Sequence, residues 1–327
     1  MKAVVFDEFG SPRKVLRVEE RPLPEPGPGQ VRVQMVLSPI HNHDLMIVTG
    51  HYGFKPELPH VPGTEALGIV EKLGEGVTRL DTGQRVTGGG SATWAEYYLA
   101  DAASLVPVPA SVDDATACQL VSMPLSAWRL LGELQVARGD WIVQNAANGA
   151  VGKVIARLAA ERGIRVLNIV RREAAVAELA AEGIGDAVSS EHADWQERAR
   201  AITGGAPIRR ALDSVAGRAS DELMDLVADE GWLISFGALS GRPVQINADN
   251  LLFKRATVKG FWAAKPSTFH TPEQIRAALV EFVQKAGRGE FKLPIADVFP
   301  LERAAEAAAA SNVAGRAGKI ALEGRLG

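Results

Sequence analysis

The sequence predicts an α/β protein with two domains, one rich in β-strands and one built on a doubly wound parallel sheet. Two observations lead to this prediction. Short β-forming runs separated by Gly and Pro fill roughly the first hundred residues. From Cys118 onward, apolar strands alternate with helical segments, which is the order typical of a parallel sheet covered by helices. A length of 327 residues allows about two such domains, each with its own core.

The β-rich domain is expected to begin with a strand in the segment Met1–Glu8. The segment Pro22–Gly29 has the composition of a linker, but apolar periodicity resumes on both sides of it. We therefore interpret it as a turn between strands. The further strands expected here are Val31–Leu37, Ala66–Leu73, Gln84–Thr87 and Glu96–Leu99.

Buried strands and amphipathic helices then alternate along the chain. The expected strands are Trp141–Val143, Arg165–Val170, Ala187–Ser189, Arg210–Val215, Trp232–Phe236 and Thr257–Trp262. The helices between them are expected at Ala150–Arg162, Ala174–Glu182, Asp194–Ile202 and Ala219–Ala228. The last part of the chain adds expected helices at Pro272–Ala286 and Leu301–Ala310 and a closing strand at Lys319–Leu322. We expect residues 118–263 to form the parallel-sheet domain, inserted between residues 1–117 and 264–327 of the β-rich domain.

The turn after the strand Trp141–Val143 predicts a dinucleotide site. Residues 147–152, Ala-Asn-Gly-Ala-Val-Gly, fit G-x-G-x-x-G with alanine in the first place. Gly149 would let the backbone approach a pyrophosphate, and Gly152 would let the helix pack closely on the strand. The first turn of the helix would offer its N–H groups to the phosphates. The expected cofactor-binding residues of this turn are Asn148, Gly149, Ala150, Val151 and Gly152.

Two arginines predict which dinucleotide binds. NAD-binding proteins usually place an acid about 20 residues beyond the glycine turn, where it bonds the ribose 2′-hydroxyl. Here Arg171 and Arg172 stand at the end of the strand Arg165–Val170. A guanidinium can bind a 2′-phosphate that a carboxylate would repel, so NADP(H) is the expected cofactor.

Composition excludes several classes of function. The formal net charge is −3 and the basic residues are scattered, so no nucleic-acid partner is expected. No apolar run approaches the roughly 20 residues that span a bilayer, so no membrane association is expected. A single cysteine, Cys118, fits a reducing cytoplasm and excludes a multi-cysteine zinc site. It lies in the apolar stretch Ala115–Val121, which favours a buried structural thiol.

Three groups of residues resemble the zinc-independent branch of the medium-chain dehydrogenase/reductase superfamily, and the resemblance covers essentially the whole chain. The first group is Gly50-His51-Tyr52-Gly53, Pro56-Glu57-Leu58-Pro59 and Val61-Pro62-Gly63-Thr64-Glu65. The second is Gln144-Asn145-Ala146-Ala147-Asn148 with Val151-Gly152, then Asn168-Ile169-Val170-Arg171-Arg172. The third is Gly260-Phe261-Trp262. Together they are similar to mitochondrial-type 2-enoyl thioester reductases, whose tyrosine signature NADPH quinone oxidoreductases share.

The resemblance implies a GroES-like catalytic domain joined to a Rossmann nucleotide-binding domain. It implies Tyr52 as the residue that stabilises a substrate oxygen or supplies a proton, and Lys319 as a contact of the cofactor phosphates. In relatives the last strand of the sheet pairs across a two-fold axis, which implies a homodimer. The residues expected to line the nicotinamide are Phe236, Gly237, Ala238, Leu239, Phe261, Trp262 and Ala263.

The resemblance also implies that no catalytic metal is bound. Zinc-using relatives have a cysteine three residues before the aspartate equivalent to Asp44, and a histidine before the glutamate equivalent to Glu65. Those places hold His41 and Thr64. The histidines at 41, 43, 51 and 60 lack zinc-site spacing, and we interpret them as one cluster of surface or cleft side chains.

Three departures bear on the substrate. Gly149 stands, as in quinone reductases, where enoyl reductases usually carry serine; Met123 replaces the asparagine of an Asn-Pro pair; and His41 replaces an asparagine usual in both groups. The leading prediction is an NADPH-dependent, metal-independent reductase of α,β-unsaturated carbonyls, with an enoyl thioester or a smaller enone as substrate. The alternatives are an NADPH quinone oxidoreductase and an NADPH-binding sensor or structural protein with negligible turnover. The basic residues Lys254, Arg255, Lys259 and Lys265 could form an entrance for a thioester with a nucleotide head group, or a solvated face.

Overall fold

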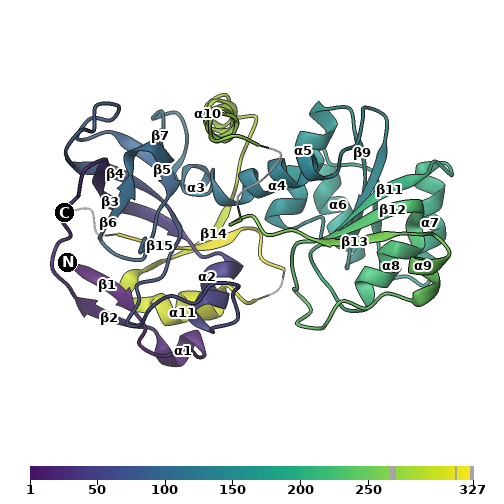
Figure 1. Cartoon of the computed structure of the whole chain (residues 1–327), viewed down its shortest axis with the longest axis horizontal. Helices are drawn as coiled ribbons and strands as arrows, with labels where there is room; N and C mark the ends of the chain where they lie inside the picture. Colours follow the sequence, from purple (N-terminus) through teal and green to yellow (C-terminus); the bar gives the residue numbers. More distant parts are fainter. Residues whose placement is uncertain (266–269, 314, 325–327) are drawn as a thin grey trace. The chain divides into compact units, whose positions relative to one another are not determined.

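The computed structural model describes residues 1–265, 270–313 and 315–324, which form two compact units. The first unit comprises residues 1–125 and 272–327, and the second comprises residues 126–271. Both divisions fall somewhat later in the chain than the expected domain boundaries. Figure 1 shows the strands of the first unit and the parallel sheet of the second. No helix among the described residues is long and apolar enough to cross a membrane.

The first unit is rich in strands, as its sequence predicts. They are β1 (Lys2–Val5), β2 (Arg17–Glu20), β3 (Gln30–Pro39), β4 (Glu65–Leu73), β5 (Arg85–Gly89), β6 (Tyr97–Asp101), β7 (Leu105–Pro107), β14 (Ile295–Pro300) and β15 (Lys319–Glu323). The helices are α1 (Pro12–Val15), α2 (Asn42–Val48), α3 (Asp114–Ala117), α10 (Pro272–Gly287) and α11 (Ala304–Ala310), with 3₁₀ turns η1 (Ala102–Ser104) and η2 (Leu301–Arg303). Helix α4 (Ser122–Glu133) begins here and continues into the second unit.

A seven-stranded sheet organises the first unit in the order β14-β15-β3-β4-β5-β7, with β6 also paired to β3. Strands β14 and β15 are parallel, and the other pairs are antiparallel. Alternate residues of β3, among them Val31, Val33 and Met35, are completely buried and belong to one apolar core with Trp94 and Tyr98.

The second unit contains the doubly wound sheet that the sequence predicts. Its strands are β8 (Trp141–Gln144), β9 (Arg165–Val170), β10 (Ala187–Ser189), β11 (Ile208–Asp213), β12 (Val227–Ser235) and β13 (Thr257–Gly260). Its helices are α5 (Ala150–Glu161), α6 (Glu173–Ala181), α7 (Trp195–Thr203), α8 (Arg218–Leu226) and α9 (Ala248–Leu252). All strands are parallel in the order β10-β9-β8-β11-β12-β13.

Helices cover both faces of this sheet (Figure 1). Trp141 and Val143 of β8 pack in one core with side chains of α7 and α8. Val170, at the end of β9, packs in a second core with side chains of α5 and α6. Burial on both faces explains why these strands appear in the sequence as continuous apolar runs.

Several predicted element boundaries are wrong for identifiable reasons. The expected strand Thr257–Trp262 ends at Gly260, because its partner strand β12 ends at Ser235, the residue that pairs with Gly260. The expected helix Ala219–Ala228 stops at Leu226 because the following residue already begins β12. Helix α2 was not predicted, and a capping box made by His41 and Asp44 begins it.

Candidate functional site

The carboxyl ends of the parallel strands meet at a topological switch point. From β8 the chain continues to β9 on one side, whereas β11 lies on the other side of β8. Connections therefore leave this place in opposite directions, which opens a crevice at the strand ends. The glycine turn follows β8 directly, so it lies at this crevice.

A buried carboxylate ties the two strand ends together at the switch point. Asp213, at the end of β11, is completely buried, and its Oδ1 accepts a hydrogen bond from Asn145 Nδ2 at 2.6 Å. The N–H groups of Val215 and Ala216 donate to the same oxygen at 2.9 and 3.0 Å, and Ser220 Oγ donates to Oδ2 at 2.6 Å. With these donors the carboxylate is well satisfied without water. The ends of β8 and β11 are thereby held in fixed register.

The glycine turn has the close approach that its sequence predicts. A Cβ on Gly152 would lie 2.7 Å from the carbonyl oxygen of Ala147, so only glycine lets α5 pack on the turn. Gly149 is the N-cap of α5 with φ of −75°, an ordinary conformation. Gln144 Nε2 donates to the Gly152 carbonyl at 2.9 Å and fixes the helix start. The first N–H groups of α5 are left to receive an anion.

The two arginines stand at the carboxyl end of β9, but their surroundings differ. The Arg171 side chain is exposed and forms no hydrogen bond or ion pair with the residues that the structure describes. Arg172 is the N-cap of α6 and its Nη2 lies 3.2 Å from Glu178 Oε1. Arg171 is therefore the more available guanidinium for a phosphate.

The segments expected to line the nicotinamide lie at the carboxyl ends of β12 and β13. Phe236 N–H bonds the carbonyl of Asp213, and Leu239 N–H bonds that of Ser214, so this segment folds back over β11. A Cβ on Gly237 would lie 2.8 Å from the Ser214 carbonyl oxygen, which explains the glycine. Phe261, Trp262 and Ala263 are partly buried, whereas Ala238 and Leu239 are exposed. All seven residues are thus grouped at one edge of the sheet.

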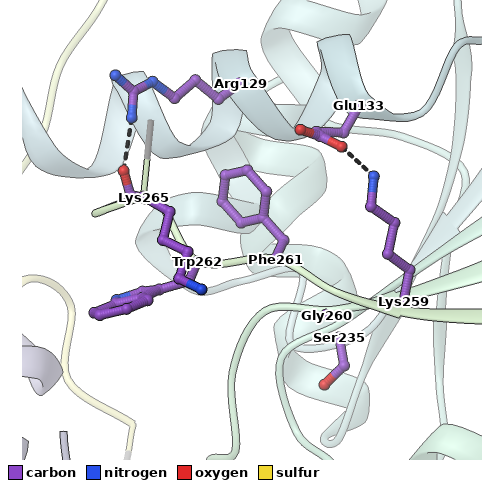
Figure 2. Close-up of a pocket in the computed structure, with 9 residues that line it drawn as sticks. Arg129, Glu133, Ser235, Lys259, Gly260, Phe261, Trp262 and Lys265 are labelled. Atoms are coloured by element: carbon purple, nitrogen blue, oxygen red, sulfur yellow. Dashed lines mark hydrogen bonds and ion pairs between the residues drawn. The ribbon is translucent and has the colours of Figure 1, made fainter. Parts of the chain in front are cut away.

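A pocket of about 360 Å³ opens beside the second of these segments (Figure 2). Within it Arg129 Nη1 donates to the Ala263 carbonyl at 2.6 Å, and Lys259 pairs with Glu133 at 2.5 Å. Its lining residues are Arg129, Glu133, Ser235, Lys259, Gly260, Phe261, Trp262, Ala263 and Lys265. Cationic and aromatic groups therefore share one concavity in the second unit.

Three of the four basic residues considered for a substrate entrance are engaged within the unit. Lys254 Nζ donates to the carbonyls of Met224 and Val227, Arg255 pairs with Glu230, and Lys259 pairs with Glu133. Lys265 lies over the Trp262 ring at 5.9 Å. These contacts favour a structural role for the first three.

Tyr52, the expected catalytic residue, follows α2 in the first unit. It is partly buried and packs against the apolar core. The ring of His43 lies 5.9 Å from the Tyr52 ring, measured between centroids. An ionisable imidazole thus accompanies the phenol, a neighbour that the sequence did not single out.

His41 does not lie on a surface or cleft, which corrects the sequence interpretation of the four histidines. It is completely buried, and its Nε2 lies 2.8 Å from Oε2 of the equally buried Glu65. Burial lowers the pKa of His41 well below its usual value. Burial also raises the pKa of Glu65 to about 7, against hydrogen bonds from Val121 and Ser122 that lower it. His41 therefore lies inside the first unit, where its ring is held by Glu65.

The residues at the zinc positions of related enzymes do not fit a zinc ion. His41 Nε2 is committed to Glu65, and the Thr64 hydroxyl is committed to Asp44 and His43. Cys118 is completely buried, and burial raises the pKa of its thiol well above the usual value. Among the described residues, no three His, Cys, Asp or Glu side chains form a group that could hold a metal.

Lys319 begins β15 and is partly buried. Burial lowers the pKa of its ammonium, while Asp44 and Glu65 act in the opposite direction. The lysine thus belongs electrostatically to the polar group around Glu65 in the first unit. Its expected contact with cofactor phosphates stays a prediction.

Comparison with known proteins places the chain in a family. Residues 27–110 match the alcohol dehydrogenase GroES-like domain, and residues 150–284 match the zinc-binding dehydrogenase domain. The mitochondrial enoyl-[acyl-carrier-protein] reductase of Homo sapiens is 30% identical over 309 residues, which cover 92% of this chain and 83% of that protein. That of Dictyostelium discoideum is 30% identical over 304 residues, covering 90% and 87%.

Solved structures agree with this assignment. A putative NADPH:quinone reductase from Bacillus thuringiensis superposes with a TM-score of 0.90 at 28% identity, over 99% of both chains. The Escherichia coli quinone oxidoreductase complexed with NADPH superposes with a TM-score of 0.88 at 26% identity, over 99% of this chain and 100% of that one. The chain belongs to the medium-chain dehydrogenase/reductase superfamily of oxidoreductases. The predicted family, fold class and enzyme class are confirmed.

The glycine turn provides a first prediction. Gly152→Ala should lower the free energy of unfolding by roughly 1–3 kcal/mol, because its Cβ would meet the backbone of Ala147 at 2.7–2.9 Å. Gly149→Ala is the matched control, since its Cβ would lie 3.1 Å from one carbonyl oxygen at an ordinary φ. Urea unfolding of both variants measures the difference. Equal losses would contradict the proposed close approach.

Glu65 provides a second prediction. Its pKa of about 7 in the folded protein exceeds the usual 4.5, so the folded state retains a proton that the unfolded chain releases. The wild type should therefore lose stability relative to Glu65→Gln as the pH rises from about 4.5 to about 7, with the full difference present above that window. Chemical unfolding across this range measures it. Glu75→Gln, at an exposed position, is the control, and a difference that did not vary with pH would contradict the prediction.

Proposed function

We propose that this protein is an NADPH-dependent, metal-independent reductase of α,β-unsaturated carbonyls, with a trans-2-enoyl thioester as its substrate class. The observation that carries the proposal is the glycine turn and the exposed Arg171 at one edge of a doubly wound sheet. The thioester class rests on the mitochondrial enoyl reductases, which match 92% of the chain at 30% identity.

The residues at the sheet edge fit an NADP(H) molecule. The N-terminal N–H groups of α5 suit the pyrophosphate, Gly149 lets the backbone approach it, and Gly152 lets α5 pack closely on the turn. Arg171, assisted by Arg172, suits the 2′-phosphate. The segments Phe236–Leu239 and Phe261–Ala263 suit the nicotinamide end, and Lys319 is proposed as a further phosphate contact. NADPH, when bound, supplies the hydride that reduces the β-carbon.

Side chains of the protein must stabilise the negative charge that hydride addition leaves on the substrate. Without a metal, the carbonyl oxygen must be stabilised by hydrogen-bond donors. The Tyr52 hydroxyl is a donor that can bond this oxygen or give its proton to the α-carbon. The aromatic wall of Phe261 and Trp262 suits an apolar acyl chain and would exclude water.

Quinone reduction is the second candidate. The specific observation in its favour is Gly149, which stands, as in quinone reductases, where enoyl reductases usually carry serine. The quinone reductases of known structure that resemble this chain support it as well. A protein that binds NADPH and turns over neither substrate is the remaining alternative.

We also propose that the protein is a homodimer of the cytoplasm. Strand β13 forms the open edge of the parallel sheet, and Val258 on it is 40% exposed. Leu252 and Phe253, just before it, are 67% and 77% exposed. An exposed apolar edge strand is a site of association. The single buried cysteine suits a reducing compartment.

Cofactor choice gives a third prediction. Arg171→Ala should raise the Michaelis constant for NADPH on the order of tenfold to a hundredfold and that for NADH little, because one charge-assisted contact is lost. Arg172→Ala should have a smaller effect, since Glu178 already pairs with it. Steady-state kinetics with both cofactors measures this. Arg165→Ala, at the amino end of the same strand, is the control. Equal effects on both cofactors would remove the 2′-phosphate argument.

The role of Tyr52 gives a fourth prediction. Tyr52→Phe should lower kcat roughly 10²- to 10⁴-fold, because the proton donor is lost while the ring is kept. NADPH affinity, measured by fluorescence titration, should not change. Tyr97→Phe removes a hydroxyl from a partly buried tyrosine in β6 and should leave kcat unchanged. Full turnover by Tyr52→Phe would exclude the assigned role.

Association gives a fifth prediction. Light scattering after size exclusion should report twice the 34.8 kDa mass of the chain. Phe253→Glu should shift the protein to the monomer, since it places a charge beside the edge strand. A wild type of monomer mass would reject the dimer.

A further inference from the structure

We propose that His43, oriented by Thr64 and Asp44, is a positioning residue that relays a proton to Tyr52 during reduction. The inference rests on the proposed function, because it takes Tyr52 as the proton donor to substrate. It adds a second proton transfer and three residues to that step. All four residues lie in the first unit.

The hydrogen bonds fix which nitrogen of His43 carries a proton. Thr64 Oγ1 donates to Asp44 Oδ1 at 2.9 Å, and a carboxylate only accepts. The single hydroxyl proton of Thr64 is therefore used. The 2.6 Å contact between His43 Nε2 and Thr64 Oγ1 must then have Nε2–H as its donor. In neutral His43 the remaining nitrogen, Nδ1, is an acceptor that can take up and release a proton.

Asp44 is a rigid anchor for this arrangement. It is completely buried, and its other oxygen, Oδ2, accepts the backbone N–H of His41 at 2.9 Å in the capping box of α2. Its Oδ1 also lies 3.6 Å from His43 Nε2, close enough to stabilise a positive imidazolium. A carboxylate that orients a histidine and stabilises its protonated form is the arrangement that proton transfer requires.

The ring of His43 lies near both a buried histidine and the phenol. Its centroid is 4.9 Å from that of His41, with an angle of 12° between the rings, so the two rings stack. His41 is fully buried and committed to Glu65. The His43 ring also lies near the Tyr52 ring, with 5.9 Å between the ring centroids and an angle of 34° between the ring planes. The His43 side chain is 23% exposed, so solvent can return a proton to it.

The proton balance of the step is simple. The Tyr52 O–H bond breaks as its proton moves to the substrate α-carbon, which carries the charge left by reduction at the β-carbon. The Nδ1–H bond of protonated His43 breaks in the same step, and its proton restores the Tyr52 hydroxyl. Neutral His43 then takes a proton from water. Asp44 and Thr64 hold the ring throughout and exchange no proton.

A structural role of His43 would use only the hydrogen bond from Nε2 to Thr64. His43→Gln tests this, because its amide N–H can replace Nε2–H toward Thr64 but cannot relay a proton. If His43 relays a proton, His43→Gln should be as slow as His43→Ala. In both variants kcat should fall on the order of 10²-fold, and the Michaelis constant for NADPH should not change. Added imidazole should restore turnover to the Ala variant. His192→Ala, which removes an exposed histidine of the second unit, is the control. Its kcat should equal that of the wild type, and added imidazole should not alter it.

The direct readout is the dependence of the rate on the mole fraction of D₂O, measured with NADPH and a trans-2-enoyl-CoA. A curved dependence in the wild type, indicating two protons in motion, should become linear in His43→Gln and His43→Ala. Wild-type turnover in His43→Gln, or the same curve in all three proteins, would overturn the relay while leaving the reductase assignment intact. Absence of wild-type turnover with enoyl thioesters and quinones would instead contradict the proposed function, and the relay with it.

Discussion

The buried carboxylate of Asp213 is the constraint on which the cofactor site depends. It accepts hydrogen bonds from the side chain of Asn145, the hydroxyl of Ser220 and two backbone N–H groups at the topological switch point between β8 and β11. Without those donors, a charge at this depth would be costly. With them, the ends of β8 and β11 cannot separate. The glycine turn, and through it the start of α5, is therefore presented to ligand from a rigid frame.

The first unit uses buried polar groups in a different way. Glu65 and His41 are both completely buried, and their pKa values move in opposite directions, so the neutral forms of both are favoured. His41 stands where zinc-using relatives have a cysteine, and Glu65 is equivalent to their glutamate. The capping box at the start of α2 then leaves His43, rather than His41, beside Tyr52. The described side chains at these positions are thus committed to hydrogen bonds with one another, and the hydrogen-bonded group of Asp44, Thr64 and His43 lies beside them.

Much of the parallel-sheet unit could be predicted from the sequence, because its buried strands form continuous apolar runs and its amphipathic helices show helical periodicity. The close approach at Gly152 could also be predicted, because the glycine pattern after a strand is a local sequence feature. The setting of His43 was not, because Thr64 lies 21 residues away and only the pairing of β3 with β4 brings their neighbourhoods together. The burial of His41 was missed because four nearby histidines gave no sign of which one faced the core. Paired surface charges such as Arg172 with Glu178 likewise depend on geometry that no sequence pattern encodes.

We propose that NADPH reduces a conjugated thioester on this protein. The most direct test follows NADPH absorbance with the purified protein, offering a trans-2-enoyl-CoA and an ortho-quinone in parallel, each also with NADH. We expect a higher kcat/KM for the thioester than for the quinone, and a preference for NADPH. Faster consumption with the quinone, or tight NADPH binding with neither substrate consumed, would contradict it.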